Sequence, residues 1–454
     1  MELKNKTVLV IGAAKSGVAA ALFLARQGSK VYLNELKPRE QVDEDILAKL
    51  ESAGVTVICG YHVDLDTIKP ELIIPSPGVP FSIPLLVRAR ELGLPVWSEM
   101  ELGSRFTKAP LVVITGTNGK TTTTALIGQI MEEAGRHTFV GGNIGVPFIS
   151  KSAELGPEDV AVLEASSFQL EGTVSFKPKV AMILNLTPDH LDRHGSMEGY
   201  IEAKARIMAN QDKDDYLILN FDDERTVQLA ERSQAQVIFF SRKHKLEEGF
   251  IIANGYLTAR FKGEELRIIA VKDILIQGGH NLENALAAAA AGWVMGVSAS
   301  IIAHSLQTFP GVEHRLEPVT TINGVLYIND SKGTNPDASI KALKAYERPI
   351  ILIAGGKSKG CDFLPLAQVI SERAKALILV GEAAPEIELA VKQVGYTNYE
   401  LVPTFREAVI RASSCGVDGD IVLLSPACAS FDLFANYEQR GEAFKEIVRE
   451  LADK

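Results

Sequence analysis

Short apolar runs that end in polar, glycine-rich loops recur along the whole chain, and segments with helical spacing of apolar residues separate them. Continuous apolar runs are typical of strands that are buried on both faces of a parallel sheet. The alternation of strand and helix therefore predicts the α/β fold class, with ligands bound at the carboxyl ends of the strands. The predicted strands cover residues 7–11, 30–33, 111–114, 160–164, 180–184, 216–220, 325–328, 349–354, 376–380 and 420–424.

The strand at 111–114 leads into a glycine loop and a predicted helix over residues 122–133. Glycines let backbone N–H groups point at phosphate oxygens, and the N-terminus of a helix favours negative charge. In such a loop Lys120 reaches the outer phosphates of a nucleotide and the Thr121 hydroxyl binds Mg²⁺. Ile114 stands where the usual first glycine would be, so the loop is a compact variant; the alternative is an ordinary turn with a chance lysine. The loop consists of Gly116, Thr117, Asn118, Gly119, Lys120, Thr121 and Thr122.

A second glycine loop, residues 12–17, follows the first predicted strand and opens a helix that extends to about residue 27. This strand–helix–strand unit has a weakened form of the dinucleotide-binding pattern, because Ala14 replaces the middle glycine. Glu35, at the end of the next strand, would hold a ribose. The alternative is a Rossmann-like domain that uses these small residues only for packing. A rigid turn at residues 75–80 follows a further strand at the same edge of the predicted sheet.

Charged side chains gather at the ends of strands in the middle of the chain. Glu164 ends an apolar strand, and a buried carboxylate is costly unless it is paired or binds a metal ion. Beside a phosphate loop the metal site is favoured. His190 lies in the polar loop after the next strand, where Asp192 and Arg193 either join a functional cluster or pair with each other. Lys204 lies in the following predicted helix and by itself is typical of a solvated lysine.

Several further polar loops allow either a ligand contact or a purely structural role. Asn143, in a glycine loop, would bind a ligand or merely form a turn. Asn284 would contact a ligand or cap the alanine-rich helix at residues 285–292. In the last third of the chain, three polar loops follow strands at one edge of a predicted sheet, which favours an anion site over three separate helix caps. These loops cover residues 329–336, 355–363 and 425–432.

The 454 residues carry a net charge of −10, with 46% hydrophobic and 23% charged residues. The length predicts about three domains, which we place at residues 1–98, 99–311 and 312–454. The negative charge argues against nucleic-acid binding, and no apolar run approaches the roughly 20 residues of a membrane-spanning helix. The first residues show no signal-peptide pattern and the four cysteines are far apart, so we expect a reduced, cytoplasmic protein.

Six stretches carry a resemblance to known enzymes. They are TGTNGKTT at 115–122, LEASSFQL at 163–170, DHLD at 189–192, HNLEN at 280–284, HR at 314–315 and NDSK at 329–332. Together they resemble the Mur ligase family, ATP-dependent amide-forming enzymes of peptidoglycan synthesis, and the resemblance covers essentially the whole chain. It implies three α/β domains: a Rossmann-like N-terminal domain for a UDP-sugar, a central P-loop ATPase-like domain for ATP, and a C-terminal Rossmann-like domain for an amino acid.

Within the family, three features resemble the members that join D-glutamate to UDP-N-acetylmuramoyl-L-alanine. They are the short first domain that begins near Gly12, the loop at 355–363 and the loop at 424–432. The resemblance implies that the alanine carboxylate attacks the γ-phosphate of ATP, and that the D-glutamate amine then attacks the acyl phosphate. Rival functions are another amino-acid-adding ligase, a folylpolyglutamate synthetase, an NAD-dependent oxidoreductase and a non-catalytic nucleotide switch. We expect a monomer whose only partners are its small-molecule substrates.

The resemblance also implies roles for individual residues. The catalytic residues would be Lys120, His190 and Lys204, with Lys204 carbamylated so that it offers an anionic oxygen. Two Mg²⁺ ions would be bound by Thr121, Glu164, His190 and Lys204. ATP would contact residues 116–122, Asn284, Arg315 and Asp330. The UDP-sugar would contact Gly12, Ala13, Ala14, Lys15, Ser16, Gly17, Asn34, Glu35, Ser76, Pro77, Gly78, Asn143 and His190. D-glutamate would contact Thr334, Lys359, Ser430, Phe431 and Tyr437.

Overall fold

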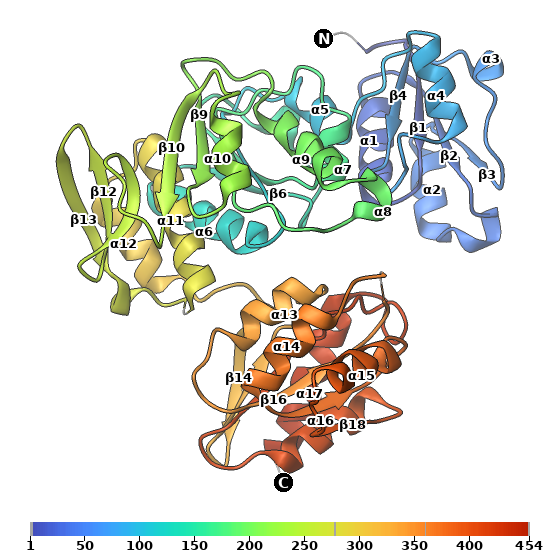
Figure 1. Ribbon diagram of the computed structural model, residues 1–454. Helices are drawn as coiled ribbons and strands as arrows, with labels where there is room; N and C mark the ends of the chain where they lie inside the picture. The colour runs from blue at the N-terminus through green and yellow to red at the C-terminus, as the bar shows by residue number, and fades with distance from the viewer. Residues whose placement is uncertain (1–2, 277, 359, 453–454) are drawn as a thin grey trace. The chain divides into compact units, whose positions relative to one another are not determined.

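The computed structural model describes residues 3–276, 278–358 and 360–452 of the chain. The described strands form three sheets with helices packed against them (Figure 1). The chain divides into two compact units. The first runs up to Ile274 and includes Glu283–Phe309, and the second comprises Leu275–Leu282 and the residues from Pro310 onward. The predicted α/β fold class is confirmed.

Four parallel strands form the first sheet together with their connecting helices. These elements are β1 (Thr7–Ile11), α1 (Lys15–Arg26), β2 (Lys30–Glu35), α2 (Glu44–Ser52), β3 (Thr56–Cys59), α3 (Leu65–Ile68), β4 (Leu72–Pro75) and α4 (Pro84–Glu91). The strand order is β3-β2-β1-β4. Val8 and Val10 of β1 pack with α1 and α2, whereas Leu9 and Ile11 pack with α4 on the other face. Burial on both faces explains the continuous apolar run in the sequence.

Nine strands form the second sheet, which is mixed. Its elements are α5 (Glu99–Ser104), β5 (Leu111–Thr115), α6 (Lys120–Glu133), β6 (Thr138–Gly142), β7 (Val160–Glu164), α7 (Ser167–Glu171), β8 (Val180–Ile183), α8 (Leu191–His194), α9 (Met197–Ala205), β9 (Tyr216–Asn220), α10 (Glu224–Ala230), β10 (Gln236–Ser241), β11 (Gly249–Ala253), β12 (Tyr256–Phe261), β13 (Glu264–Ala270), α11 (Gly279–Val294) and α12 (Ala299–Thr308). The order is β13-β12-β11-β10-β9-β8-β5-β7-β6. An antiparallel ribbon, β11–β13, which the sequence analysis did not predict, extends the parallel part.

The first two sheets belong to one unit because they share a hydrophobic core. Leu102 of α5 and Ile149 are fully buried in the same cluster as Leu24 of α1 and Leu33 of β2. The glycine loops that follow β1 and β5 therefore belong to a single compact unit.

Six strands form the third sheet, in the second unit. Its elements are β14 (Glu317–Ile322), β15 (Val325–Asn329), α13 (Pro336–Leu343), β16 (Ile350–Ala354), α14 (Leu364–Arg373), β17 (Ala374–Leu379), α15 (Ala384–Gln393), β18 (Tyr399–Leu401), α16 (Phe405–Cys415), β19 (Ile421–Leu424) and α17 (Tyr437–Ala452). The order is β14-β15-β19-β16-β17-β18, and among the described strands of this sheet only the β14–β15 pair is antiparallel. Leu352 and Leu423 face the core with α13–α15, and Ile353 and Val422 face the core with α16 and α17.

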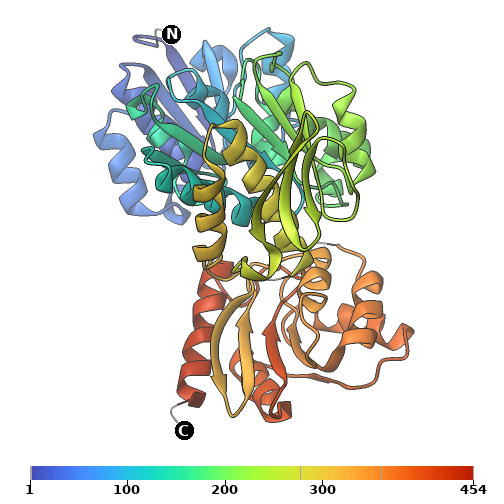
Figure 2. The same ribbon diagram turned by 90° about the vertical axis from the view of Figure 1, so that its left-hand side faces the viewer.

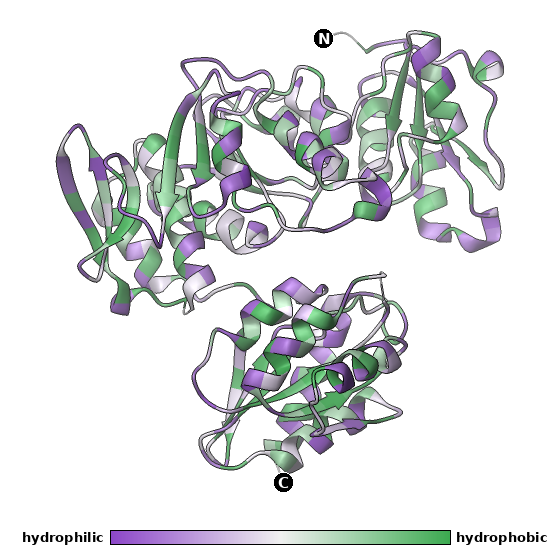
Figure 3. Cartoon of the chain, in the orientation of Figure 1, coloured by the Kyte–Doolittle hydropathy of each residue, from purple (hydrophilic) through white to green (hydrophobic). Residues whose placement is uncertain are grey.

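The predicted helices are present with shifted ends. Helix α6 begins at Lys120 rather than at residue 122, and α11 extends beyond the alanine run in both directions. Ala285–Ala291 are fully buried, as close helix packing requires. Figure 3 shows hydrophobic residues concentrated in the strands and hydrophilic residues on the outer faces of helices and in loops. Among the described residues, no helix has both the length and the apolar content needed to cross a membrane.

Candidate active site

The predicted phosphate loop lies between β5 and α6, at the carboxyl end of the strand. Gly116 and Gly119 have φ angles of 145° and 87°, which side-chain-bearing residues rarely adopt. A Cβ atom on Gly119 would lie 2.3 Å from Oδ1 of Asn284, so the loop packs closely against α11. The same Asn284 oxygen accepts a hydrogen bond from the Thr123 hydroxyl at 3.3 Å. The structure thus brings the predicted ATP-binding residues of the first unit together.

Two lysine side chains meet at the backbone of this loop. Lys120 Nζ donates hydrogen bonds to the carbonyl oxygens of Gly116 at 3.0 Å and Thr117 at 2.8 Å. Lys204 Nζ donates to the same Gly116 oxygen at 2.8 Å. Burial, reinforced by the charge on Lys120, holds the pKa of Lys204 well below its ordinary value. The interpretation of Lys204 as a solvated helix lysine is wrong, since the side chain is 2% exposed.

Glu164 is held by neutral donors at the end of β7. Its Oε2 atom accepts a hydrogen bond from the Thr121 hydroxyl at 2.7 Å, and its Oε1 atom accepts one from the Asn143 side-chain amide at 2.9 Å. The carboxyl group is buried, at 2% exposure. Hydroxyl and carboxylate oxygens in contact are the donor chemistry that Mg²⁺ prefers, so Thr121 and Glu164 fit a magnesium site. Asn143, predicted at the UDP-sugar, reaches this same carboxylate.

His190 and its neighbours form the start of the short helix α8. His190 has a φ angle of 53°, its ring packs edge-on against Phe168 at 4.8 Å between centroids, and its Nε2 atom lies 3.6 Å from Oδ2 of Asp189. Arg193, for which pairing with Asp192 was one interpretation, instead pairs with Glu171 at 2.7 Å. His190 and Arg193 are therefore both tied to α7.

Arg193 also fixes the turn after β4. Its guanidinium donates to the carbonyl oxygens of Pro77 at 2.9 Å and Val79 at 3.2 Å. Sequence reasoning missed this role, because no local pattern connects an arginine on α8 with a turn more than a hundred residues earlier.

A pocket of about 560 Å³ opens at the carboxyl edge of the first sheet. The structure therefore brings together most of the predicted UDP-sugar residues. Glu35 holds the glycine loop, because its carboxylate accepts hydrogen bonds from the backbone N–H groups of Ala13 at 2.7 Å and Lys37 at 3.0 Å. Of the predicted residues, those that line the pocket are Gly12, Ala13, Ala14, Asn34, Glu35, Ser76 and Gly78.

Lys15 lies outside the 560 Å³ pocket. It lines a neighbouring pocket of about 510 Å³ with Arg26, Lys49 and Lys151. The Asn34 side-chain amide donates to the carbonyl oxygens of Ile58 and Tyr61, so this residue supports the pocket wall. The predicted UDP-sugar residues thus differ in role, and some of them serve the pocket by holding its backbone.

Arg315 and Asp330 lie together in the second unit, with 3.7 Å between Arg315 Nη1 and Asp330 Oδ1. Asp330 is fully buried, and its carboxylate accepts hydrogen bonds from the Ser425 hydroxyl at 2.7 Å and from the backbone N–H of Leu316 at 3.3 Å. Burial raises the pKa of Asp330 to about 6, although the Arg315 charge opposes the rise. Burying this carboxyl group in its charged form therefore costs folding free energy, and such shifted pKa values are common at ligand-binding sites.

Of the predicted D-glutamate residues, Thr334, Ser430 and Phe431 lie on loops at the same edge of the third sheet. Ser430 is buried and Phe431 is 67% exposed. Tyr437 begins α17, and its hydroxyl accepts a hydrogen bond from Lys332 Nζ at 2.8 Å. Thr334 lies on the 329–336 loop, partly buried. Lys359 lies outside the described residues.

Arg440 joins these loops, and sequence reasoning missed it. Its guanidinium donates to the hydroxyl and carbonyl oxygens of Ser331 at 3.0 and 2.8 Å and to the carbonyl oxygen of Cys428 at 3.2 Å. Burial lowers the pKa of Arg440 to about 10. Its position three residues after Tyr437, on the same face of an amphipathic helix, is the signal that would have identified it.

The comparisons with known proteins agree with the motifs. Residues 114–292 match the Mur ligase middle domain, and residues 314–428 match the domain described as Mur ligase, glutamate ligase domain. The chain is 48% identical to a UDP-N-acetylmuramoylalanine–D-glutamate ligase of Pelotomaculum thermopropionicum, over 99% of both chains. It is 47% identical to the enzyme of the same name from Alkaliphilus metalliredigens, again over 99% of both.

Solved structures share the fold at low sequence identity. The MurF ligase of Thermotoga maritima in complex with ADP matches with a TM-score of 0.62 and 17% identity, over 93% of this chain and 96% of that one. The UDP-N-acetylmuramate-alanine ligase MurC of the same organism matches with a TM-score of 0.60 and 22% identity, over 99% and 100%. The resemblance that the six stretches indicated is thus confirmed: the chain belongs to the Mur ligase family.

Proposed function

We propose that the chain joins D-glutamate to UDP-N-acetylmuramoyl-L-alanine at the expense of ATP, releasing ADP and phosphate in peptidoglycan synthesis. The chain aligns over 99% of its length with relatives whose names state this activity. The observation that carries the chemistry is the contact between Thr121, beside Lys120 at the head of α6, and the buried Glu164. It joins a phosphate loop to a carboxylate of the kind that accompanies nucleotide-bound magnesium.

The proposed reaction brings two anions together. A carboxylate is a poor nucleophile toward a triphosphate because like charges repel, so the site must supply positive charge. The alanine carboxylate oxygen attacks the γ-phosphorus and ADP leaves. The D-glutamate amine then attacks the acyl carbon, loses a proton and displaces phosphate. Lys120 would exchange its loop carbonyls for the outer phosphates, and the backbone N–H groups of residues 116–122 would hold the remaining oxygens.

Two Mg²⁺ ions are part of the proposal, and bound magnesium would neutralise phosphate charge. Thr121 and Glu164 would hold one ion. His190 and Lys204 would hold the other, with Lys204 carbamylated. Carbamylation of a lysine requires the neutral amine, and the burial of Lys204 disfavours its protonated form. Its place beside the Gly116 carbonyl brings the modified side chain to the phosphate loop.

Each of the three predicted domains is assigned a main substrate, and ATP would also contact the third. Residues 1–98 would bind the UDP-sugar, residues 99–311 the ATP phosphates, and residues 312–454 D-glutamate, while Arg315 and Asp330 would bind ATP phosphate and ribose. The pocket beside Gly12 supports the first assignment. The protein would act as a monomer in the cytoplasm, without nucleic-acid or membrane partners.

A four-component assay tests the function. We expect release of ADP and phosphate only when ATP, Mg²⁺, UDP-N-acetylmuramoyl-L-alanine and D-glutamate are all present. Equal turnover with L-alanine or L-lysine in place of D-glutamate would refute the assignment. Lys120→Ala is expected to abolish turnover while the circular dichroism spectrum stays unchanged, and retained turnover in this variant would remove the phosphate loop from the mechanism.

A further inference from the structure

The turn that carries Arg315 has a strained backbone and lies against the last helix. His314 and Leu316, on either side of Arg315, have φ angles of 62° and 45°, in the left-handed region that non-glycine residues rarely adopt. Such strain persists only where the surroundings hold it. Figure 2 shows α17, in red, beside strands β14 and β15, with which it is in contact. The contacts of α17 are therefore the natural source of that restraint.

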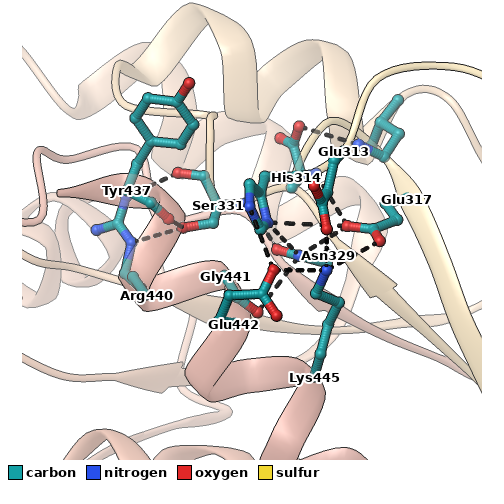
Figure 4. A network of polar contacts seen from close by, with 12 residues as sticks. Glu313, His314, Glu317, Asn329, Ser331, Tyr437, Arg440, Gly441, Glu442 and Lys445 are labelled. Atoms are coloured by element: carbon teal, nitrogen blue, oxygen red, sulfur yellow. Dashed lines mark hydrogen bonds and ion pairs between the residues drawn. The ribbon is translucent and has the colours of Figure 1, made fainter. Parts of the chain in front are cut away.

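Lys445 of α17 places its ammonium among three carboxylates (Figure 4). It is bonded to Glu313, and it lies 2.7 Å from Glu442 Oε1 and 3.3 Å from Glu317 Oε1. Burial lowers the pKa of Lys445, but hydrogen bonds to Glu313 and Glu442 outweigh this effect and the pKa lies above its ordinary value. Glu313 has a lowered pKa for the same reason, so both groups are charged.

This cluster is not a metal site. Glu313, His314 and Glu442 offer ligand atoms within 4.8 Å of one another, as a metal ion would require. The Lys445 ammonium is already bonded to both carboxylates of this set. The Lys445 ammonium, and not a metal ion, thus supplies the positive charge beside Glu313 and Glu442.

Further contacts lock the same turn to the strand that ends beside Asp330. The Asn329 Oδ1 atom accepts from the Ser331 backbone N–H at 3.1 Å, which directs the Nδ2 group to His314 Nδ1 and Glu317 Oε2, both at 3.0 Å. The His314 backbone N–H donates to Glu317 Oε2 at 2.9 Å. A Cβ atom on Gly441 of α17 would lie 2.2 Å from His314 Nδ1, so the imidazole ring of His314 can pack at this position only because the residue is glycine.

We propose that Lys445 is a positioning residue for the nucleotide, which acts through Glu313 and Glu317 to hold the strained turn that sets Arg315 beside Asp330. The inference rests on the proposed function, because the ATP contacts of Arg315 and Asp330 belong to it. Without the ammonium, Glu313 and Glu317 repel each other. The turn then relaxes toward an ordinary backbone conformation and displaces Arg315, while the D-glutamate loops keep their own contacts through Arg440.

The test uses Lys445→Met in the full chain, because methionine keeps the apolar stem and removes the charge. We expect the KM for ATP to rise about tenfold while kcat and the KM for D-glutamate change less than about twofold. Lys445→Arg should restore most of the ATP affinity. Glu313→Gln should also raise the KM for ATP. The double variant should have a KM for ATP no higher than that of Lys445→Met, because each change breaks the same contact between Lys445 and Glu313.

Lys392→Met is the matched control, because it removes an exposed lysine that pairs with a glutamate at 2.8 Å on α15 in the same unit. It should leave both KM values unchanged. An unchanged KM for ATP in Lys445→Met overturns the inference. An equal rise in the KM for ATP and the KM for D-glutamate, with a lowered melting temperature, also overturns it. If the unaltered protein fails the four-component assay, the proposed function fails instead. Calorimetric titration of the unaltered protein and Lys445→Met with MgATP then decides the positioning role by itself.

Discussion

The ammonium of Lys204 and that of Lys120 share one acceptor, the carbonyl oxygen of Gly116, at 2.8 and 3.0 Å. Two ammonium groups that share one acceptor repel each other, and the repulsion is offset by a bound anion or removed when one of them loses its charge. Lys204 is the buried partner, so the proton is lost more readily there. The arrangement suits a neutral or carbamylated Lys204 beside the proposed phosphate loop.

Lys204→Ala should lose activity that a small carboxylate partly restores. We expect kcat to fall about 100-fold or more, because an electrostatic group at the reacting phosphate is removed. Acetate or propionate would occupy the vacated space and supply the oxygens of the proposed carbamate. Phosphate release, measured with sodium acetate and with sodium chloride at equal ionic strength, checks this. No difference between the two salts would count against carbamylation. Lys151→Ala, at a largely exposed lysine of the same unit, serves as the control.

Thr121→Val should weaken the response to magnesium. Valine keeps the shape of threonine but cannot donate to Glu164, whose carboxylate now accepts from that hydroxyl at 2.7 Å. We expect kcat to fall about 100-fold and half-maximal activation to move to higher Mg²⁺ concentration. Thr121→Ser retains the hydroxyl and should stay near the unaltered protein. Superimposable magnesium activation curves for the three proteins would show that Thr121 is not a ligand.

The sequence predicted the fold well where burial produces a recognisable pattern of consecutive residues. The run before Gly116 is apolar because both faces of β5 are covered, and the glycines that follow have the φ angles that such a loop needs. Lys204 leaves no comparable signal, because which face of its helix becomes buried depends on distant segments. Asn143 shows an intermediate case. The glycine loop was recognisable, but its amide contact with Glu164 depends on the pairing of β6 with β7.

Arg193→Lys should loosen the turn that borders the proposed UDP-sugar pocket. A guanidinium donates to the carbonyl oxygens of Pro77 and Val79 and to Glu171 at the same time, whereas one ammonium cannot match that geometry. We expect the KM for UDP-N-acetylmuramoyl-L-alanine to rise about tenfold while the KM for ATP stays unchanged. Steady-state kinetics with each substrate varied in turn measures both.

A matched substitution separates this effect from a general loss of an arginine. Arg232 pairs with Glu202 through an exposed contact of 2.6 Å in the same unit. Arg232→Lys should therefore leave both KM values near those of the unaltered protein, since exposed ion pairs contribute little. If Arg193→Lys raises the two KM values together, the arginine supports the unit as a whole and not the turn.

Asp330→Asn should stabilise the second unit while it weakens ATP binding. Burial raises the pKa of Asp330 to about 6 from an ordinary value of 3.8. Between these values the folded chain binds more protons than the unfolded chain, so stability falls as the pH rises through about 6. At pH 8 the charged carboxyl group costs at most about 3 kcal/mol of unfolding free energy, because one pKa unit corresponds to about 1.4 kcal/mol. Asparagine carries no such charge.

The gain from Asp330→Asn should therefore be largest at about pH 8 and shrink toward zero near about pH 4, which denaturant titrations across this range measure. The KM for ATP should rise, because the amide offers a ribose hydroxyl one acceptor oxygen instead of two. Asp418→Asn, at an exposed aspartate of the same unit, should give no pH-dependent gain. A difference between Asp330→Asn and the unaltered protein that is constant from about pH 4 to pH 8 would show that the charge of Asp330 is not what costs stability.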